Sequence, residues 1–179
     1  MSHISFSALK IWKDCAFKYK LVYVDGIPSF AGNEYTAFGT AIHEACERKV
    51  QDPGIDEVEV FKSKFDEEIG KFPTDTVFKQ NINEMKEQGI ALAGQVYEEL
   101  KRYFGNFKVV SAEEELLLPI DGTEFEFKGY VDLIVQTDDG KYHILDYKTC
   151  SWGWDAQKKN DALTNYQLTL YKHFFGKKI

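Results

Sequence analysis

Cysteine is scarce in this chain: its 179 residues include only Cys15, Cys46 and Cys150. Three unevenly spaced cysteines do not make the disulfide framework of a small secreted domain. No apolar run approaches the roughly 20 residues that a membrane-spanning helix needs, and the first residues lack the basic-then-apolar layout of a secretory signal. Internal repeats and low-complexity tracts are also missing. We therefore expect a protein of the reducing cytoplasm that has no membrane partner.

Packing material, by contrast, is abundant. Apolar residues make up 44% of the chain and aromatic residues 15%, which excludes an intrinsically disordered protein. A chain of this length can bury one sizeable core. We expect residues 1–179 to form a single domain.

The charge balance varies along the chain. The total is −7 at neutral pH, which at first argues against a nucleic-acid partner. Residues 1–30 carry a balance of +2 and residues 140–179 a balance of +4, so the middle holds −13. Two basic ends that meet could form one positive groove, where the local field matters more than the total. An ordinary solvated surface would give the same balance, so charge alone does not decide.

The first 105 residues predict helices. Ser5 is placed as a helix N-cap, and Asp52-Pro53-Gly54 has the composition that ends a helix. Apolar residues recur at amphipathic-helix spacing over about residues 6–15, 36–51, 56–70 and 80–104.

The pattern changes after residue 105. Asp121-Gly122 and Asp138-Asp139-Gly140 are hairpin signals. The segments around them predict strands and then a helix, near residues 107–119, 123–136, 141–148 and 161–175. This order predicts an α+β fold in which helices flank a central mixed sheet. Residues 1–105 would form the helical part, and residues 106–179 would carry the sheet and most of the site.

Two of the predicted strands carry isolated acids. Asp146 and Lys148 are two residues apart, so in a strand their side chains share a face. Asp132 lies in an apolar run, where a carboxylate is costly to bury unless it is paired, hydrogen-bonded or bound to a cation. A surface ion pair and a carboxylate bonded to nearby backbone would explain each residue separately. Together, two carboxylates and a lysine suit phosphodiester hydrolysis, because the acids hold a hard divalent cation and the lysine offsets charge on the phosphate.

Two predicted helices add polar residues at helical spacing. His43 and Glu47 are four residues apart, as are Gln167 and Tyr171, so each pair lies on one helix face. A lone histidine in an amphipathic helix is also a common structural residue. Gln167 and Tyr171 would equally suit the edge of a core.

Five motifs follow one another along the chain: Gly39-Thr40-Ala41-Ile42-His43, Ala112-Glu113-Glu114-Glu115, Gly129-Tyr130-Val131-Asp132, Asp146-Tyr147-Lys148-Thr149 and Gln167-x-x-x-Tyr171. Each is weak alone, but their order resembles the signature of the RecB-like nucleases of the PD-(D/E)XK superfamily, a group that includes phage exonucleases and CRISPR-adaptation nucleases. The segment from Ser5 to Tyr19 resembles the family's N-terminal motif, with Ala16 where proline is usual. The resemblance extends from about residue 4 to residue 171.

The resemblance implies a restriction-endonuclease-like core and a role for each matching residue. It implies that Mg²⁺ or Mn²⁺ is bound by His43, Asp132, Asp146 and the backbone carbonyl of Tyr147. Lys148 would be the catalytic lysine, and Glu113 fits the family's strand glutamate best. Gln167 and Tyr171 would support the site or the substrate phosphate, and Glu47 and Glu115 would orient these groups from behind.

Some members of the family hold an iron–sulfur cluster through four cysteines. Cys15 occupies the position of the first ligand, but no cysteine follows Tyr171, and four thiolates are the usual requirement. We therefore expect no cluster in this chain. Its abrupt end at Ile179 predicts a natural protein that continues further.

These inferences predict a metal-dependent deoxyribonuclease of a bacterial or phage-infected cell. It would act as an exonuclease or end-processing enzyme on single-stranded or frayed DNA ends, with a recombination or helicase protein as partner. The alternatives are a catalytically inactive DNA-binding module of the same fold and an assembly protein whose charges are merely solvated.

The path of the DNA is expected between the N-terminal helix and the loop at residues 151–160. Lysines there lie beside aromatic residues that can stack on bases: Lys18, Lys20, Trp152, Trp154, Lys158 and Lys159. Trp12 is expected to pack in the core instead. Core packing stays an open alternative for Trp152 and Trp154.

Overall fold

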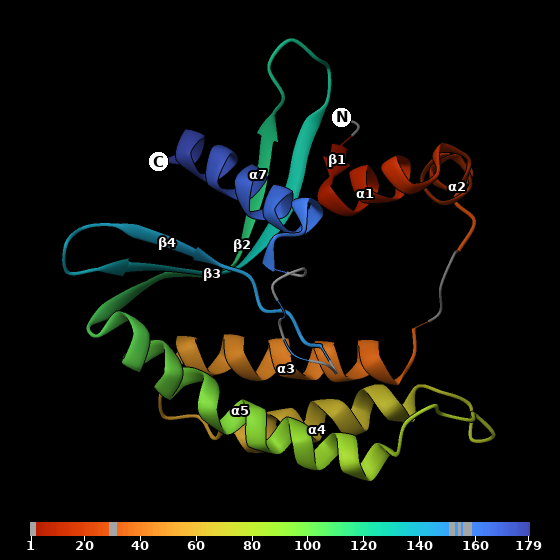
Figure 1. Ribbon diagram of the computed structural model, residues 1–179, viewed down its shortest axis with the longest axis vertical. Coiled ribbons are helices and arrows are strands. Elements are labelled where there is room, and N and C mark those ends of the chain that lie inside the picture. Colours follow the sequence, from red (N-terminus) through yellow and green to blue (C-terminus); the bar gives the residue numbers. More distant parts are fainter. Residues whose placement is uncertain (1–2, 29–31, 151–152, 154, 156–158) are drawn as a thin grey trace.

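The computed structural model describes residues 3–28, 32–150, 153, 155 and 159–179 (Figure 1). Along the chain the elements are β1 (His3–Ser5), α1 (Phe6–Asp14), α2 (Ala16–Tyr19), the π-helix η1 (Lys20–Val24), α3 (Glu34–Gln51), α4 (Glu57–Gly70), α5 (Ile82–Phe104), β2 (Phe107–Pro119), β3 (Glu126–Thr137), β4 (Tyr142–Leu145) and α7 (Ala162–Lys178). Among the described residues, no helix combines the length and the apolar character needed to cross a membrane.

Strand β3 is the centre of one mixed sheet. β2 pairs with it antiparallel along its whole length, from Phe107 opposite Thr137 to Pro119 opposite Glu126. Two short strands share the other edge of β3: β1 pairs parallel with residues 126–128, and β4 pairs antiparallel with residues 133–136. A central mixed sheet flanked by helices confirms the expected fold class.

Helices cover both faces of this sheet (Figure 1). One buried cluster joins α7 to β2 and β3: Leu116, Phe127, Val131, Ile134, Tyr171, Phe174 and Phe175. A second cluster joins α3 and α5 to the opposite face: Val50, Leu100, Leu133 and Val135. Full burial of a side chain of this size stabilises the fold by roughly 1.5–3 kcal/mol, so β3 is fixed from both sides.

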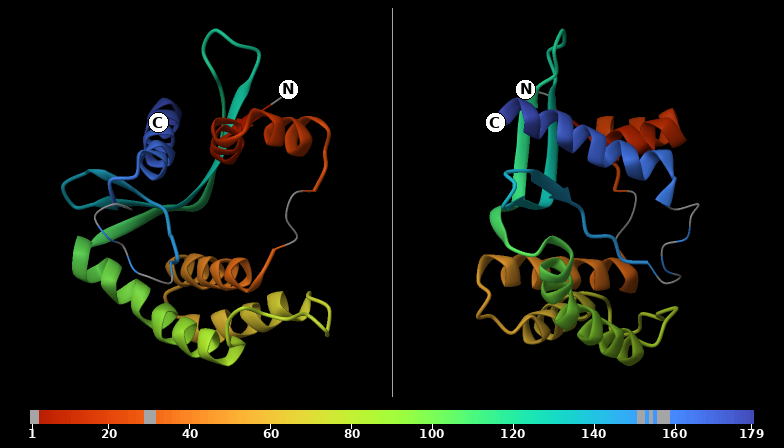
Figure 2. Two further views of the ribbon diagram at one scale, coloured as in Figure 1. Left: turned by 45° about the vertical axis from the view of Figure 1, so that its right-hand side comes forward. Right: turned by 60° about the vertical axis from the view of Figure 1, so that its left-hand side comes forward.

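The helical part is layered below the sheet. Helix α4 and the start of α5 lie on the side of α3 that faces away from the strands (Figure 2). Phe61 and Phe65 of α4 are fully buried there, with their rings stacked at 5.5 Å between centroids. Gly89 of α5 lies directly over Phe61, because a Cβ at residue 89 would come within 1.8 Å of the Phe61 ring. The glycine therefore permits the close approach of the two helices.

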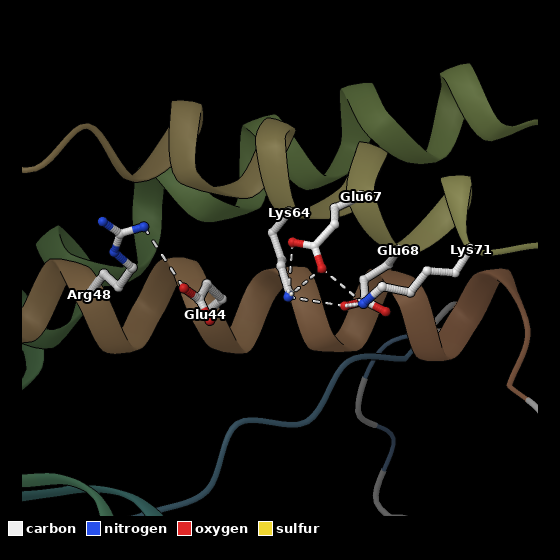
Figure 3. Close-up of polar contacts among 6 residues, drawn as sticks. All are labelled: Glu44, Arg48, Lys64, Glu67, Glu68 and Lys71. Carbon is white, nitrogen blue, oxygen red and sulfur yellow. Dashed lines mark hydrogen bonds and ion pairs between the residues drawn. The ribbon is translucent and has the colours of Figure 1, made fainter.

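Charged residues on α3 and α4 pair along each helix rather than toward the sheet (Figure 3). Lys64 lies 3.2 Å from Glu67 and 3.1 Å from Glu68, and Lys71 contacts the same two acids. Such pairs, three and four residues apart near the surface, contribute only tenths of a kcal/mol each, roughly. They solubilise the helices and take no part in the site below.

The expected elements match the structure with a few corrections. β4 ends at Leu145 instead of residue 148, because the amide of Tyr147 bonds to the side chain of Asp132 and not to a neighbouring strand. β1 was not expected, since three residues are too few to show a periodicity. Trp12 is 58% exposed, so its expected place in the core is wrong; helix α1 turns this face toward solvent.

Candidate active site

Helix α3 presents His43 to the sheet. Ala41 and Ala45, on either side of it, are fully buried, and such small side chains let the helix lie close to its neighbours. His43 Nε2 is 2.9 Å from the carbonyl oxygen of Tyr147, so in the neutral ring this nitrogen carries the proton and donates. The other nitrogen, Nδ1, is 3.6 Å from Oδ2 of Asp132. In that tautomer a lone pair faces a carboxylate.

Asp132 is a buried carboxylate on the central strand. Only 7% of the residue is exposed. Its Oδ2 accepts the backbone N–H of Tyr147 at 2.6 Å. Burial raises the pKa of Asp132, while His43 and the Tyr147 amide act in the opposite direction. The strand therefore holds a carboxylate whose negative charge is only partly compensated by the protein.

Glu113 reaches the same place from β2. The pairs Ala112–Leu133 and Glu114–Val131 put it opposite Asp132. Its φ of 52° is the one positive value recorded for a non-glycine residue in the described chain, and strain of this kind is typical of functional positions. Desolvation and repulsion from Asp132 and Glu47 raise the pKa of Glu113.

Three ligand atoms converge as a result. One atom each of His43, Glu113 and Asp132 lies within 4.8 Å of the other two. An imidazole nitrogen and two carboxylates form a donor set suited to a divalent cation such as Mn²⁺ or Mg²⁺. A cation there would also relieve the repulsion between the two acids.

Asp146 and Lys148 lie beside this cluster, just past the end of β4. The Asp146 side chain is only 7% exposed, and its Oδ2 is 2.5 Å from Nζ of Lys148. Its Oδ1 accepts a hydrogen bond from Gln167 Nε2 at 3.0 Å, and the same nitrogen lies 2.9 Å from the hydroxyl oxygen of Tyr171. Helix α7 thus fixes the orientation of the Asp146 carboxylate.

The structure brings together eight of the residues named from the sequence: His43, Glu113, Asp132, Asp146, Tyr147, Lys148, Gln167 and Tyr171. Glu47 is near enough to raise the pKa of Glu113. Glu115 lies elsewhere: its carboxylate accepts from the Tyr130 hydroxyl at 2.9 Å and pairs with Lys128 at 3.4 Å. The positive φ at Glu113 interrupts the strand alternation, so residues 113 and 115 do not share a face as expected.

The expected DNA contacts are placed only in part. Lys18, Lys20 and Lys159 are exposed, and Lys20 pairs with Asp25 at 2.5 Å. Trp152, Trp154 and Lys158 lie outside the described residues.

Two contributions to the site were not expected from the sequence. The backbone N–H of Tyr147 holds Asp132, and a backbone group leaves no sequence signal. Gly129 lets α7 approach β3, because a Cβ there would meet the Tyr171 ring at 2.8 Å and Phe127 at 3.1 Å. The glycine at the start of Gly129-Tyr130-Val131-Asp132 was a usable signal, since strand glycines often mark close approach.

A mixed sheet that carries converging acids beside an Asp–Lys pair, clamped by a final helix, defines a nuclease of the PD-(D/E)XK class. Residues 3–178 match the PD-(D/E)XK nuclease superfamily, and the chain belongs to it.

The chain is also similar to bacterial proteins that are named as one of the subunits of an ATP-dependent helicase/deoxyribonuclease. That of Streptococcus agalactiae serotype Ia (strain A909) is 29% identical over 175 residues, covering 93% of this chain and 16% of the relative. That of Streptococcus uberis is 29% identical over 176 residues, with 94% and 16% covered. The chain thus spans about a sixth of the length of these curated relatives.

Members of this superfamily use divalent metal ions, and the residues present fit such an ion. The cluster supplies hard oxygen donors and one imidazole, and its acids lack full compensation within the protein. The Tyr147 carbonyl borders the same position through its bond to His43.

Proposed function

We propose that this chain hydrolyses phosphodiester bonds of DNA with Mg²⁺ or Mn²⁺, as an exonuclease or end-processing nuclease. The observation that carries the proposal is the convergence of His43, Glu113 and Asp132 beside the Asp146–Lys148 pair. His43, Asp132, Asp146 and the Tyr147 carbonyl would hold the cation, with Glu113 as a further carboxylate at the same position. A cation held there supplies Lewis acidity at the phosphate and acidifies water.

The protein's own groups prepare the phosphate position. Lys148 is 39% exposed in its side chain, so its ammonium group can leave Asp146 and meet negative charge that develops on a phosphate oxygen. Gln167 holds Oδ1 of Asp146 while it contacts Tyr171, which restricts the rotation of the carboxylate. Gln167 and Tyr171 are thus positioning residues, whereas Lys148 touches the substrate.

A preference for single-stranded or frayed ends is supported by the N-terminal helices. Trp12 and Phe17 are 58% and 67% exposed, beside Lys13 and Lys18. Lys13 Nζ lies 5.7 Å from the centroid of the Tyr166 ring on α7, so α1 borders the helix that carries Gln167. Aromatic residues of this kind stack on unpaired bases of any sequence, and lysines neutralise the backbone.

A helicase partner is proposed from the relatives, whose printed names describe helicase/deoxyribonuclease subunits. The proposed setting is the cytoplasm of a bacterial or phage-infected cell.

The direct test is incubation of the protein with end-labelled DNA, single- and double-stranded, linear and circular, in Mn²⁺, Mg²⁺ or EDTA. The proposal expects cutting of linear single strands with either metal, weaker cutting of blunt duplexes and none in EDTA. Equal cutting of circular DNA would replace exonuclease by endonuclease action, and no cutting of any substrate would refute the proposed function.

A further inference from the structure

A cavity of about 590 Å³ lies between α3 and α5, beneath residues 147–150. Its floor is apolar and is formed by one stripe from each helix: Phe38, Ile42 and Cys46 of α3, and Met85, Leu92 and Val96 of α5. This volume is within the range of small-molecule sites, roughly 300–1,000 Å³. Neither the metal cluster nor the Asp146–Gln167 contact uses this space.

The rim of the cavity carries groups that recognise flat polar edges. Gln80, Asn81 and Gln88 each offer a carboxamide, which donates and accepts hydrogen bonds in one plane. Gln80 already bonds to Tyr35, and Asn81 to Glu84. The side chain of Gln88 makes no hydrogen bond within the described part of the chain. Its carboxamide is therefore available to a ligand.

Tyr147 adds an unsatisfied group to the same wall. It lines the cavity, and its hydroxyl is buried with no hydrogen-bond partner among the residues that the structure describes. A buried polar group without a partner costs about 1–3 kcal/mol, so a ligand that reached it would gain that much of an advantage. The backbone carbonyl of this residue faces His43, so Tyr147 connects the cavity with the metal cluster.

Lys148 is common to the cavity lining and to the Asp146 pair. A group that occupies the cavity therefore lies next to the position proposed for the phosphate. In a nucleotide, the base is separated from its phosphate by one sugar. Glu84 on the rim disfavours a phosphate inside the cavity, whereas an apolar floor with amides at its edge suits a nucleobase.

We propose that this cavity receives one unpaired nucleobase of the DNA strand being cut, adjacent to the phosphate beside Lys148. The inference rests on the proposed function and deepens it. A base that is paired in a duplex is held in the helical stack and cannot enter, so the cavity selects single-stranded or frayed ends at the reacting nucleotide itself.

The test compares single-stranded oligonucleotides that carry every base with versions that have one abasic site, placed in turn at each of the last few nucleotides. Cleavage in Mn²⁺ gives KM and kcat, and binding in Ca²⁺ gives Kd. For the wild type, loss of the base at one position should raise KM and Kd about fivefold or more, the range that stacking of a single base provides. Equal values at every position would overturn the inference.

Two variants and a matched control assign the effect to the cavity. Gln88→Trp fills the space from an exposed position of α5, and Gln95→Trp makes the same change two turns further along at a residue outside the lining. Gln88→Trp should abolish the difference between base-bearing and abasic DNA, and Gln95→Trp should retain it. Tyr147→Phe loses no hydrogen bond within the described protein. It should keep its melting temperature and lose part of the base preference.

The outcomes separate the two proposals. Base-dependent binding without cleavage would refute the proposed nuclease function and keep the cavity as a base site. Cleavage that ignores the missing base, or an equal response of Gln88→Trp and Gln95→Trp, would refute the base site alone and leave the groove to an apolar segment of a partner protein.

Discussion

Asp132 and Asp146 are two nearly buried carboxylates on adjacent segments, with side chains 9% and 7% exposed. Each has contacts that hold its oxygens in place: the Tyr147 amide for Asp132, and Gln167 with Lys148 for Asp146. Only Asp146 has a full positive charge beside it. At the scale of the residue, the remaining charge on Asp132 and Glu113 is the reason to expect a cation.

Asp146→Asn and Lys148→Ala should each lower the rate of DNA cleavage by about 10²-fold or more, the scale of one lost electrostatic contact in the transition state. Asn retains the size of Asp without its charge. Lys148→Ala should leave Mn²⁺ affinity nearly unchanged, because lysine is not a ligand. Cleavage assays and metal titration measure both effects.

Lys141→Ala is the control for this pair of variants. Lys141 lies in the β3–β4 hairpin, its side chain is 73% exposed, and its partner is Asp139. It should cut DNA as the wild type does. Near-normal cleavage by Lys148→Ala would contradict the assignment of this lysine.

The three cysteines should differ in reactivity. Cys15 and Cys150 are exposed, and Cys46 is buried, which raises the pKa of its thiol to about 12. The Cys46 thiol therefore stays protonated and inaccessible at neutral and mildly alkaline pH. A thiol reagent should modify two cysteines in the native protein and the third only after denaturation. Rapid modification of all three would contradict the packing of α3.

At the scale of the element, most of the fold could be predicted from the sequence. The helices and β2 follow from periodicity and capping residues, such as Ser5 before α1 and Asp56 before α4. β1 could not be predicted, because its pairing with β3 is long-range and spans only three residues. The site residues could be named from motifs, whereas Glu115 was misplaced because the strained backbone at Glu113 has no pattern in the sequence.

The packing of α5 on α4 depends on one glycine. In Gly89→Ala the new Cβ would lie 1.8 Å from the Phe61 ring, so the fully buried ring must move, at a cost of about 1–3 kcal/mol. Gly94→Ala on the same helix meets only Val58, at 3.4 Å. It should be neutral or stabilise by up to about 1 kcal/mol, since alanine favours helices. Urea unfolding curves compare the two variants, and equal stabilities would contradict the close contact.

At the scale of the whole molecule, the acidic total charge conceals a basic N-terminal region and a basic C-terminal region. Helices α1 and α7 carry these regions and contact each other through Lys13 and Tyr166. The sheet lies between α7 and the layer of α3 and α5 (Figures 1 and 2). The two basic ends therefore adjoin the side of the sheet from which Gln167 reaches Asp146.

DNA binding should weaken steeply with salt despite the net charge of −7. Each lysine–phosphate contact on a single strand adds roughly 0.7 to the slope of log affinity against log salt. Lys13→Ala and Lys18→Ala should each reduce that slope, measured by fluorescence anisotropy in Ca²⁺. A slope near zero would contradict a path of the DNA along the basic ends.

The metal dependence of cleavage tests the central claim most directly. The rate of cutting of a labelled single strand is measured against Mn²⁺ concentration for the wild type and for Asp132→Asn, with circular dichroism to verify that both are folded. We predict no cutting without metal, a saturable rise for the wild type, and a rise that is lost or displaced to much higher Mn²⁺ in the variant. Cutting without a divalent metal, or identical curves for the two proteins, would contradict a nuclease site built around His43, Glu113 and Asp132.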